Sequence, residues 1–481
     1  MNSQFQQSQS QSQSQSQTQL PAGLFYLYLL ILCWSPLPWG SEANWSLNLL
    51  SLSCLSLLLL TLLAGILKNI DLLNKLRPYR WPLLLLGVVA VWITIQSVPL
   101  PLNVLQTLSP ITVFYYTQVG LEPATISMEP GVTQMQAVFT CALWCMFALT
   151  VLLVDSAARV RTLMLVIVIS GVSQALYGSF MTLSGLEYGF LEAKTTMRGV
   201  ATGTYISRNH LAGYLEMCLA VGIGLLVSQL NKGGSRGWRD QLRRGIDTLL
   251  GPKMRLRIYL ALMVIALVLT RSRMGNTAFF IALPLCGFLM MALQRKFNKG
   301  AIILFVSLIL VDTLIVGQWF GFEEVAQRLQ ATSAETESRT EVNRDIIPMW
   351  QNHYLAGVGA GAFGGSYSLY KSPEVRIFNF LHAHNDYLEL AITLGLIGFI
   401  PLCLLVLLAL FRAVKTLYKR HDQLSIGLAF AALMGMVSLL IHSAVDFNLH
   451  IPANSLLFVV LLALAFLSLN LPREKHSSAS V

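Results

Sequence analysis

Long apolar runs recur along almost the whole chain. Each approaches the length of about 20 residues that a helix needs to cross a hydrocarbon core of about 30 Å. The runs are continuous rather than alternating, which indicates helices and disfavours strands. The pattern predicts an all-α polytopic membrane protein with about twelve transmembrane helices and with both chain ends on one side. The runs lie near 21–40, 46–67, 81–99, 135–154, 162–182, 209–230, 257–270, 276–293, 301–320, 386–411, 424–445 and 454–471.

Composition and charge support this assignment. Only 12% of the 481 residues are charged, whereas soluble domains carry about 25%, so an ordinary soluble enzyme is excluded. The net charge of +10 could suggest a nucleic-acid partner, but 23 of the 33 basic residues lie on one side of the twelve-helix arrangement. The positive-inside rule makes that side cytoplasmic, so the basic excess reports topology and we expect no nucleic acid to bind.

The same pattern divides the chain into regions. We expect residues 1–19, a Gln/Ser repeat with too few apolar residues to form a core, to be a disordered cytoplasmic tail. Residues 20–200 form an N-terminal transmembrane region, 201–472 a second one, and 473–481 a cytoplasmic tail. The longest outer loop, 321–385, follows the ninth helix and is too long to be only a connector. Its stretch "GVGAGAFGGS" is expected to be flexible, and it lacks the Lys-Ser/Thr of a phosphate loop.

Three arginines are unusual because they stand on the outer side, against the charge bias. Arg271 and Arg273 lie in "LTRSRMGN", a short turn between two apolar runs, and Arg208 directly precedes another run. They could extend to the outer headgroups. Alternatively they form a fixed cationic site for a phosphate-bearing ligand, because the guanidinium fork matches phosphate oxygens.

A second group of polar residues stands at the start of the tenth expected helix, in "HAHND". Asn385 and Asp386 are both suitable N-cap residues, and we expect Asp386 to cap the helix. His384 lies just outside it, where the helix N-terminus attracts anions and disfavours an imidazolium. A neutral imidazole at that place can take a proton from a sugar hydroxyl. The sequence therefore predicts a general base at the mouth of a membrane helix.

Other polar residues are expected at the same membrane edge. Glu216 lies about two turns inside its apolar run and needs a partner, which an outer arginine could supply. His442 and His450 could pack or form hydrogen bonds, and Asp446 lies between them.

Several of these stretches resemble one family. His384-Asn385, nine residues, Gly395, two residues and Gly398 resemble the signature of the O-antigen ligase/polymerase superfamily. "SRMG", "RNHLAGYL", "GVGAGAF" and "DFNLHIPAN" are also similar to its exopolysaccharide members, so the resemblance covers roughly 200–455. It implies a GT-C-like membrane glycosyltransferase that uses a glycan on undecaprenyl pyrophosphate at the periplasmic face.

The resemblance also implies roles for individual residues. An outer arginine would hold the pyrophosphate, and His384 would activate the acceptor. The resemblance implies no nucleotide sugar, no cofactor and no metal. Asp386 and Glu389, one helical turn apart, could bind a divalent ion, but we expect them not to, since the arginines already serve the leaving group. The implied pyrophosphate-binding candidates are Arg273, Arg271 and Arg208, and candidates for acceptor-site or supporting roles are His382, Asn385, Glu216, His442 and Asp446.

Three functions compete. The first is a polymerase that joins lipid-linked repeat units into exopolysaccharide or O-antigen in the bacterial inner membrane, with a repeat-unit flippase and a chain-length regulator as partners. The second is an O-antigen ligase that transfers the finished glycan to lipid A core or protein. The absence of an Arg-x-x-x-Leu element among the outer basic residues favours the polymerase. A transporter or flippase is less favoured, because the polar residues gather at one face rather than at the midplane of two repeats.

Overall fold

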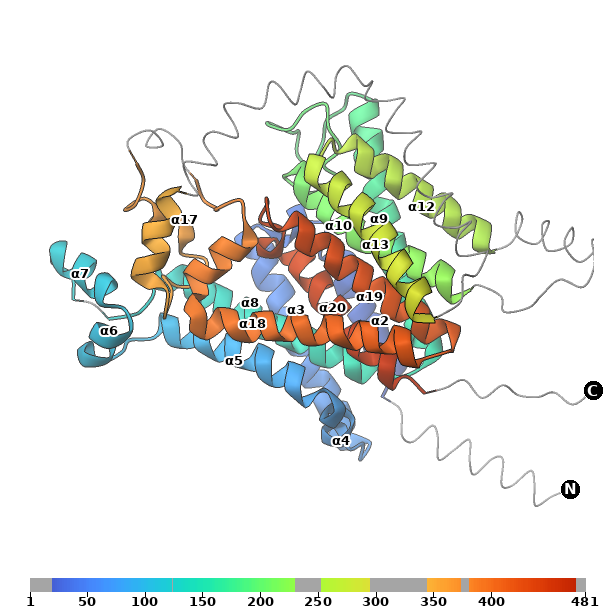
Figure 1. The fold of residues 1–481 in the computed structure, drawn as a ribbon, viewed down its shortest axis with the longest axis horizontal. Helices are drawn as coiled ribbons and strands as arrows, with labels where there is room; N and C mark the ends of the chain where they lie inside the picture. Colours follow the sequence, from blue (N-terminus) through green and yellow to red (C-terminus); the bar gives the residue numbers. More distant parts are fainter. Residues whose placement is uncertain (1–19, 123, 230–251, 295–343, 373–379, 473–481) are drawn as a thin grey trace, which may run out of the picture.

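The computed structural model describes residues 20–122, 124–229, 252–294, 344–372 and 380–472, and this part is helical apart from one isolated bridge between Tyr188 and Ala193 (Figure 1). Within the described residues, nine helices are long and apolar enough to cross a membrane, as expected of a membrane-embedded protein. They are α3 (Asn44–Leu67), the continuous stretch Leu72–Ser97 formed by α4 (Leu72–Leu76), η2 (Arg77–Tyr79) and α5 (Arg80–Ser97), α8 (Pro130–Leu153), α9 (Ala157–Leu183), α10 (Arg208–Ser228), α13 (Arg273–Gln294), α18 (Asp386–Lys419), α19 (Gln423–His442) and α20 (Pro452–Asn470).

The other three expected spans have different outcomes. Two shorter helices occupy expected apolar runs: α2 (Ala22–Trp34) has 13 residues and α12 (Pro252–Leu269) has 18. The expected span 301–320 lies outside the described residues, as do the expected tails 1–19 and 473–481 and part of the loop 321–385. The polytopic all-α class is thus confirmed, whereas the count of twelve stays a prediction.

The interior is built around α10, α19 and α20, which are buried on nearly all sides. Small residues bring α10 and α19 together, because a Cβ on Gly224 would overlap the carbonyl oxygen of Gly427, and the reverse. In membranes such small residues let helix backbones approach closely. Figure 1 shows α12 and α13 on one side of this central group and α5 and α18 on another. By contrast α3 exposes a row of leucines, as a lipid-facing helix would.

Gly395 interrupts α18 at its tenth residue. It has φ 60° and ψ 177°, a conformation that is essentially restricted to glycine. The backbone groups freed by this break bond to neighbouring segments: Leu396 N donates to Tyr354 O (2.8 Å), and Trp92 Nε1 donates to Leu394 O (2.7 Å). A broken helix is tolerated at membrane depth only where such partners exist.

The Gly-rich stretch 357–366 is one of these partners, and the expectation that it is flexible is wrong. Val358 N donates to Ile392 O (3.0 Å) and Gly359 N donates to Thr393 O (3.1 Å), next to the break in α18. Its glycines are needed for close approach, because a Cβ on Gly357 would overlap the backbone at Thr393 and Gly395. The stretch leads into the short helix α17 (Phe363–Tyr367). The connection between α5 and α8 contains α6 (Leu102–Leu108) and α7 (Pro110–Gln118).

Candidate active site

Residues from three distant parts of the chain meet at one end of the helix bundle. The start of α10, the start of α18 and the end of α19 converge on the loop 443–451, which contains η4 (Asn448–His450). The opposite ends of α18 and α19 carry Lys419 and Arg420, and the 20 residues of α19 separate the two ends by about 30 Å. The polar group is therefore remote from the basic connection between these helices. Its ionisable members are His210, Glu216, His382, His384, Asp386, Glu389, His442, Asp446 and His450.

The start of α18 holds His384 in place. Asn385 is the N-cap, and its side-chain oxygen accepts from Tyr387 N (3.0 Å) and Leu388 N (3.2 Å). The prediction that Asp386 caps the helix is wrong, because Asp386 is the first helical residue and is fully buried. Its backbone N donates to the carbonyl oxygens of Ser443 and Asp446 (2.9 and 3.1 Å) and so fastens α18 to the end of α19.

His384 faces a carboxylate from the loop after α19. Its φ is 51°, a left-handed conformation that residues other than glycine seldom adopt. His384 Nδ1 lies 3.8 Å from Asp446 Oδ1, while the His384 side chain keeps 31% of its surface exposed. Burial by itself raises the pKa of Asp446, but the nearby imidazoles of His384, His210 and His442 lower it more. The pKa therefore lies well below its ordinary value, and Asp446 is a stable anion beside His384.

Glu216 extends this pair into a chain of four groups. The expectation that an outer arginine pairs with Glu216 is wrong: its two oxygens lie 2.8 Å from His442 Nδ1 and 2.6 Å from Ser438 Oγ, which donates to it. His442 Nε2 in turn lies 3.8 Å from Asp446 Oδ2. Glu216 and His442 are fully buried. These four groups thus form a continuous series from the buried interior of the bundle to the partly exposed imidazole of His384. Their order is Glu216, His442, Asp446 and His384.

A second cluster lies beside this chain. His382 Nδ1 is 2.8 Å from Glu389 Oε1, and the same oxygen is 3.5 Å from His450 Nε2. His450 Nε2 is also 3.6 Å from Asp386 Oδ1. His382 is a candidate from the sequence, but His450 receives no specific role there and Glu389 only a rejected one. The proximity of the pair depends on the tertiary fold.

Phe447 lies between the two clusters. Its ring is stacked on the imidazole of His382 (centroids 4.1 Å apart, interplanar angle 10°) and meets His384 edge-on at 5.0 Å. It also meets His210 edge-on at 4.7 Å. One aromatic side chain therefore limits the orientation of three imidazoles. The sequence reasoning missed Phe447, although it lies within the stretch "DFNLHIPAN".

The three outer arginines lie at the same end of the bundle. Arg208 is the first residue of α10, is half-buried, and has its Nε buried without a hydrogen-bond partner among the described residues. Arg273 begins α13, and Arg271 precedes it with φ 53°; both side chains are exposed. The start of α13 packs on α10 beside Glu216, since a Cβ on Gly275 would lie 3.1 Å from Glu216 Oε1. The N-termini of α10 and α13, which carry Arg208 and Arg273, thus lie at the end of the bundle that holds the histidine group.

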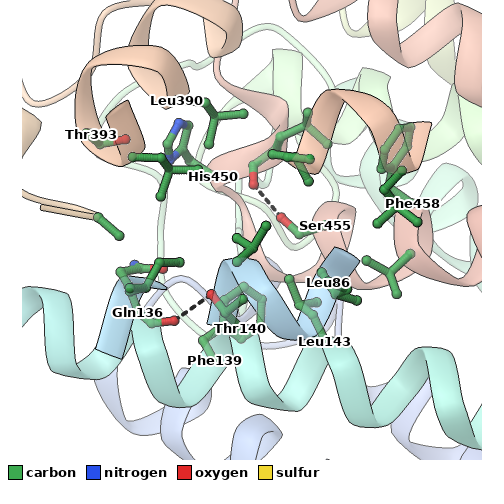
Figure 2. Close-up of a pocket in the computed structure, with 18 of the residues that line it drawn as sticks. Leu86, Gln136, Phe139, Thr140, Leu143, Leu390, Thr393, His450, Ser455 and Phe458 are labelled. Atoms are coloured by element: carbon green, nitrogen blue, oxygen red, sulfur yellow. Dashed lines mark hydrogen bonds between the residues drawn. The ribbon is translucent and has the colours of Figure 1, made fainter. Parts of the chain in front are cut away.

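An apolar cavity of about 130 Å³ lies next to His450 (Figure 2). Its walls come from α5, α8, α18 and α20, with Leu86, Phe139, Leu390 and Phe458 among the labelled side chains. A cavity with such walls accepts hydrocarbon more readily than water. It therefore places an apolar compartment directly beside the ionisable groups.

A comparison with protein families matches part of the chain that contributes to this site. Residues 258–403 match the family model described as O-Antigen ligase. This range includes Arg271, Arg273 and the start of α18, but it ends before His442 and Asp446. An uncharacterized protein of Haemophilus influenzae is 30% identical over 173 residues, which is 32% of this chain and 43% of that relative. The chain thus covers less than half of the length of this relative.

Proposed function

We propose that the protein is a membrane glycosyltransferase, because residues 258–403 match the O-antigen ligase family model, in agreement with the resemblance predicted from the sequence. In this proposal it polymerises oligosaccharide repeat units linked to undecaprenyl pyrophosphate into exopolysaccharide or O-antigen. The reaction takes place at the periplasmic face of the inner membrane. The observation that carries the proposal is the half-exposed imidazole of His384, backed by the buried anion Asp446 and lying at the same end of the bundle as three arginines.

The histidine acts as the general base. With Nδ1 of His384 directed at Asp446, the other ring nitrogen is available to the acceptor sugar. A hydroxyl oxygen of the acceptor attacks the anomeric carbon of the donor, and its proton moves to His384. The bond between that carbon and the pyrophosphate oxygen breaks, and the electron pair leaves with the pyrophosphate. The separation of 3.8 Å between His384 and Asp446 is longer than a hydrogen bond, as is common for catalytic pairs without substrate.

The surroundings suit a lipid-linked donor. Arg208, Arg271 and Arg273 would hold the pyrophosphate, because several guanidinium forks can share its charge as it develops. The apolar cavity beside His450 would take part of the hydrocarbon chain of the carrier. Glu216 and His442 would hold Asp446 in its position relative to His384.

The alternative is a ligase that moves finished glycan to lipid A core or protein by the same chemistry. One variant tests the base and separates the two functions. His384→Ala should lose most of its activity, by about 10²–10⁴-fold, with the variant protein still present in the membrane. If the protein is a polymerase, single repeat units should accumulate on the carrier. If it is a ligase, long carrier-linked chains should accumulate and none should reach the final acceptor.

The assay is extraction of carrier-linked glycan followed by size analysis. His353→Gln is the matched control, because His353 lies on the same outer side but bonds to Tyr370 (3.0 Å). We expect single units, since the ligase-type Arg-x-x-x-Leu element is missing. Long chains on the carrier would reject the polymerase and would remain consistent with a ligase in which His384 is the general base. Normal product from His384→Ala would reject His384 as the base.

A further inference from the structure

Two histidines and a buried carboxylate converge at the start of α18, apart from the pair of His384 and Asp446. We propose that His382, Glu389 and His450 bind a divalent transition-metal ion of the Zn²⁺ type. The ion would join the segment before α18 to the loop after α19. Imidazole and carboxylate groups are ligands that such ions prefer in proteins.

The distance between Glu389 and His450 fits a shared ion better than a hydrogen bond. Metal–ligand bonds of about 2.0–2.2 Å at tetrahedral angles place neighbouring ligand atoms about 3.3–3.6 Å apart. Glu389 Oε1 and His450 Nε2 are 3.5 Å apart, which matches this spacing and is too long for a hydrogen bond. His382 Nδ1 is 2.8 Å from the same oxygen, and the three ligand atoms all lie within 4.8 Å of one another. The His382 side chain is 30% exposed, and a small shift of its ring within the stacking plane would bring Nδ1 to the same spacing.

Two buried polar atoms beside this site also lack partners. His450 Nε2 and Asp386 Oδ1 face each other at 3.6 Å, and neither has a hydrogen-bond partner among the described residues. Asp386 is fully buried and Glu389 is 1% exposed, so two carboxylates share a small space of low polarity. A buried carboxylate oxygen or ring nitrogen without a hydrogen-bond partner is costly. A cation bound to Glu389 and His450 would neutralise both carboxylates at once.

The surroundings hold the ligands in a suitable orientation. Ala383 N donates to Glu389 Oε2 (2.7 Å), which leaves Oε1 for the ion. Phe447 stacks on the His382 ring and fixes its plane. The His382 side chain is 30% exposed, so an ion can enter from that side. The proposal departs from the expectation that Asp386 and Glu389 bind no ion, because the fold adds two imidazoles that the local sequence does not place there.

The test measures metal content in purified protein, without substrate and without a polyhistidine tag. Protein in detergent is loaded with equimolar Zn²⁺, desalted, and analysed by inductively coupled plasma mass spectrometry. We expect one zinc ion per chain in the unmodified protein and in His353→Gln. His450→Gln and Glu389→Gln should lose the ion. Loading with Co²⁺ should give the visible absorption of a tetrahedral site only where zinc is retained.

Further variants keep the result independent of the proposed glycosyl transfer. His384→Gln should retain zinc although it should lose activity, because His384 is not a ligand. Folding of each variant is checked by size-exclusion chromatography and circular dichroism. If a ligand variant does not fold, the thermal transition of the unmodified protein is measured with and without Zn²⁺, and it should rise with zinc. Folded unmodified protein that retains no more zinc than His450→Gln, or whose transition zinc leaves unchanged, would overturn the proposal, as would loss of zinc in His353→Gln.

Discussion

The break in α18 offers a sharp test of how the sequence signature relates to the fold. Replacing Gly395 by Ala adds one methyl group at a residue with φ 60° and ψ 177°. Strain in this conformation costs a non-glycine residue about 1–3 kcal/mol. The new Cβ would also overlap Leu355 O and Gly357 N. Both are backbone atoms in a packed segment, so the overlap adds about 1–3 kcal/mol.

The two contributions predict that Gly395→Ala lowers the free energy of unfolding by about 2–6 kcal/mol. A backbone shift that relieved this overlap would still lower stability, because it would break the hydrogen bonds from Leu396 N to Tyr354 O and from Gly359 N to Thr393 O. The first turn of α18 would shift with them, so activity should fall as well. Gly131→Ala is the control: Gly131 lies in the first turn of α8, and a Cβ there meets nothing within 4 Å.

The measurement is reversible unfolding in mixed micelles, followed by circular dichroism as the denaturing detergent increases. Gly131→Ala should be neutral or slightly more stable than the unmodified protein, since alanine is the better helix former. Equal stability of Gly395→Ala and Gly131→Ala would show that residue 395 does not hold a glycine-only conformation. The break in α18 would then not explain why the sequence signature has glycine at residue 395.

Three further predictions concern the site and the topology. Asp446→Asn should lower turnover by about 10²–10⁴-fold, the range of a positioned base, while the Michaelis constant for the lipid-linked donor changes little; an equal rise in that constant would instead assign Asp446 to binding. Arg273→Ala should abolish product with normal protein in the membrane, and Arg273→Lys should restore only part of it, because lysine keeps the charge but loses the fork. Full activity in Arg273→Ala would assign that side chain to the lipid headgroups. Reporter fusions at Lys419 should read cytoplasmic and fusions at Glu192 periplasmic, and a cytoplasmic signal at Glu192 would reject the proposed mechanism.

The sequence by itself determined the class of the protein and the position of most helices. Apolar runs of membrane length have few structural solutions, because every backbone polar group must be satisfied inside the bilayer. The helices therefore begin and end near the predicted residues, as α10 and α19 do. The sequence also located His384, Asn385 and the three arginines, since local motifs and charges against the topological bias are visible in one dimension.

Only the tertiary structure decided which polar groups meet. Glu216 and His442 are separated by 226 residues but lie 2.8 Å apart, and the partner of Glu216 is a histidine and not the expected arginine. Local sequence could not distinguish Asn385 from Asp386 as the cap, because either side chain can accept from the first turn. The choice follows from long-range contacts: Leu449 N donates to Asp386 Oδ2 (3.0 Å) and draws that side chain into the bundle.

The Gly-rich stretch shows the same limit. Composition alone suggests flexibility, since glycine has the largest conformational freedom of any residue. In the fold that freedom lets residues 357–359 approach the break at Gly395 and donate hydrogen bonds to the carbonyl oxygens of Ile392 and Thr393. The hydrophobic pattern and the distribution of basic residues indicate which segments cross the membrane and in which orientation. The chemistry at the bundle end depends on distances between segments, and packing alone sets those distances.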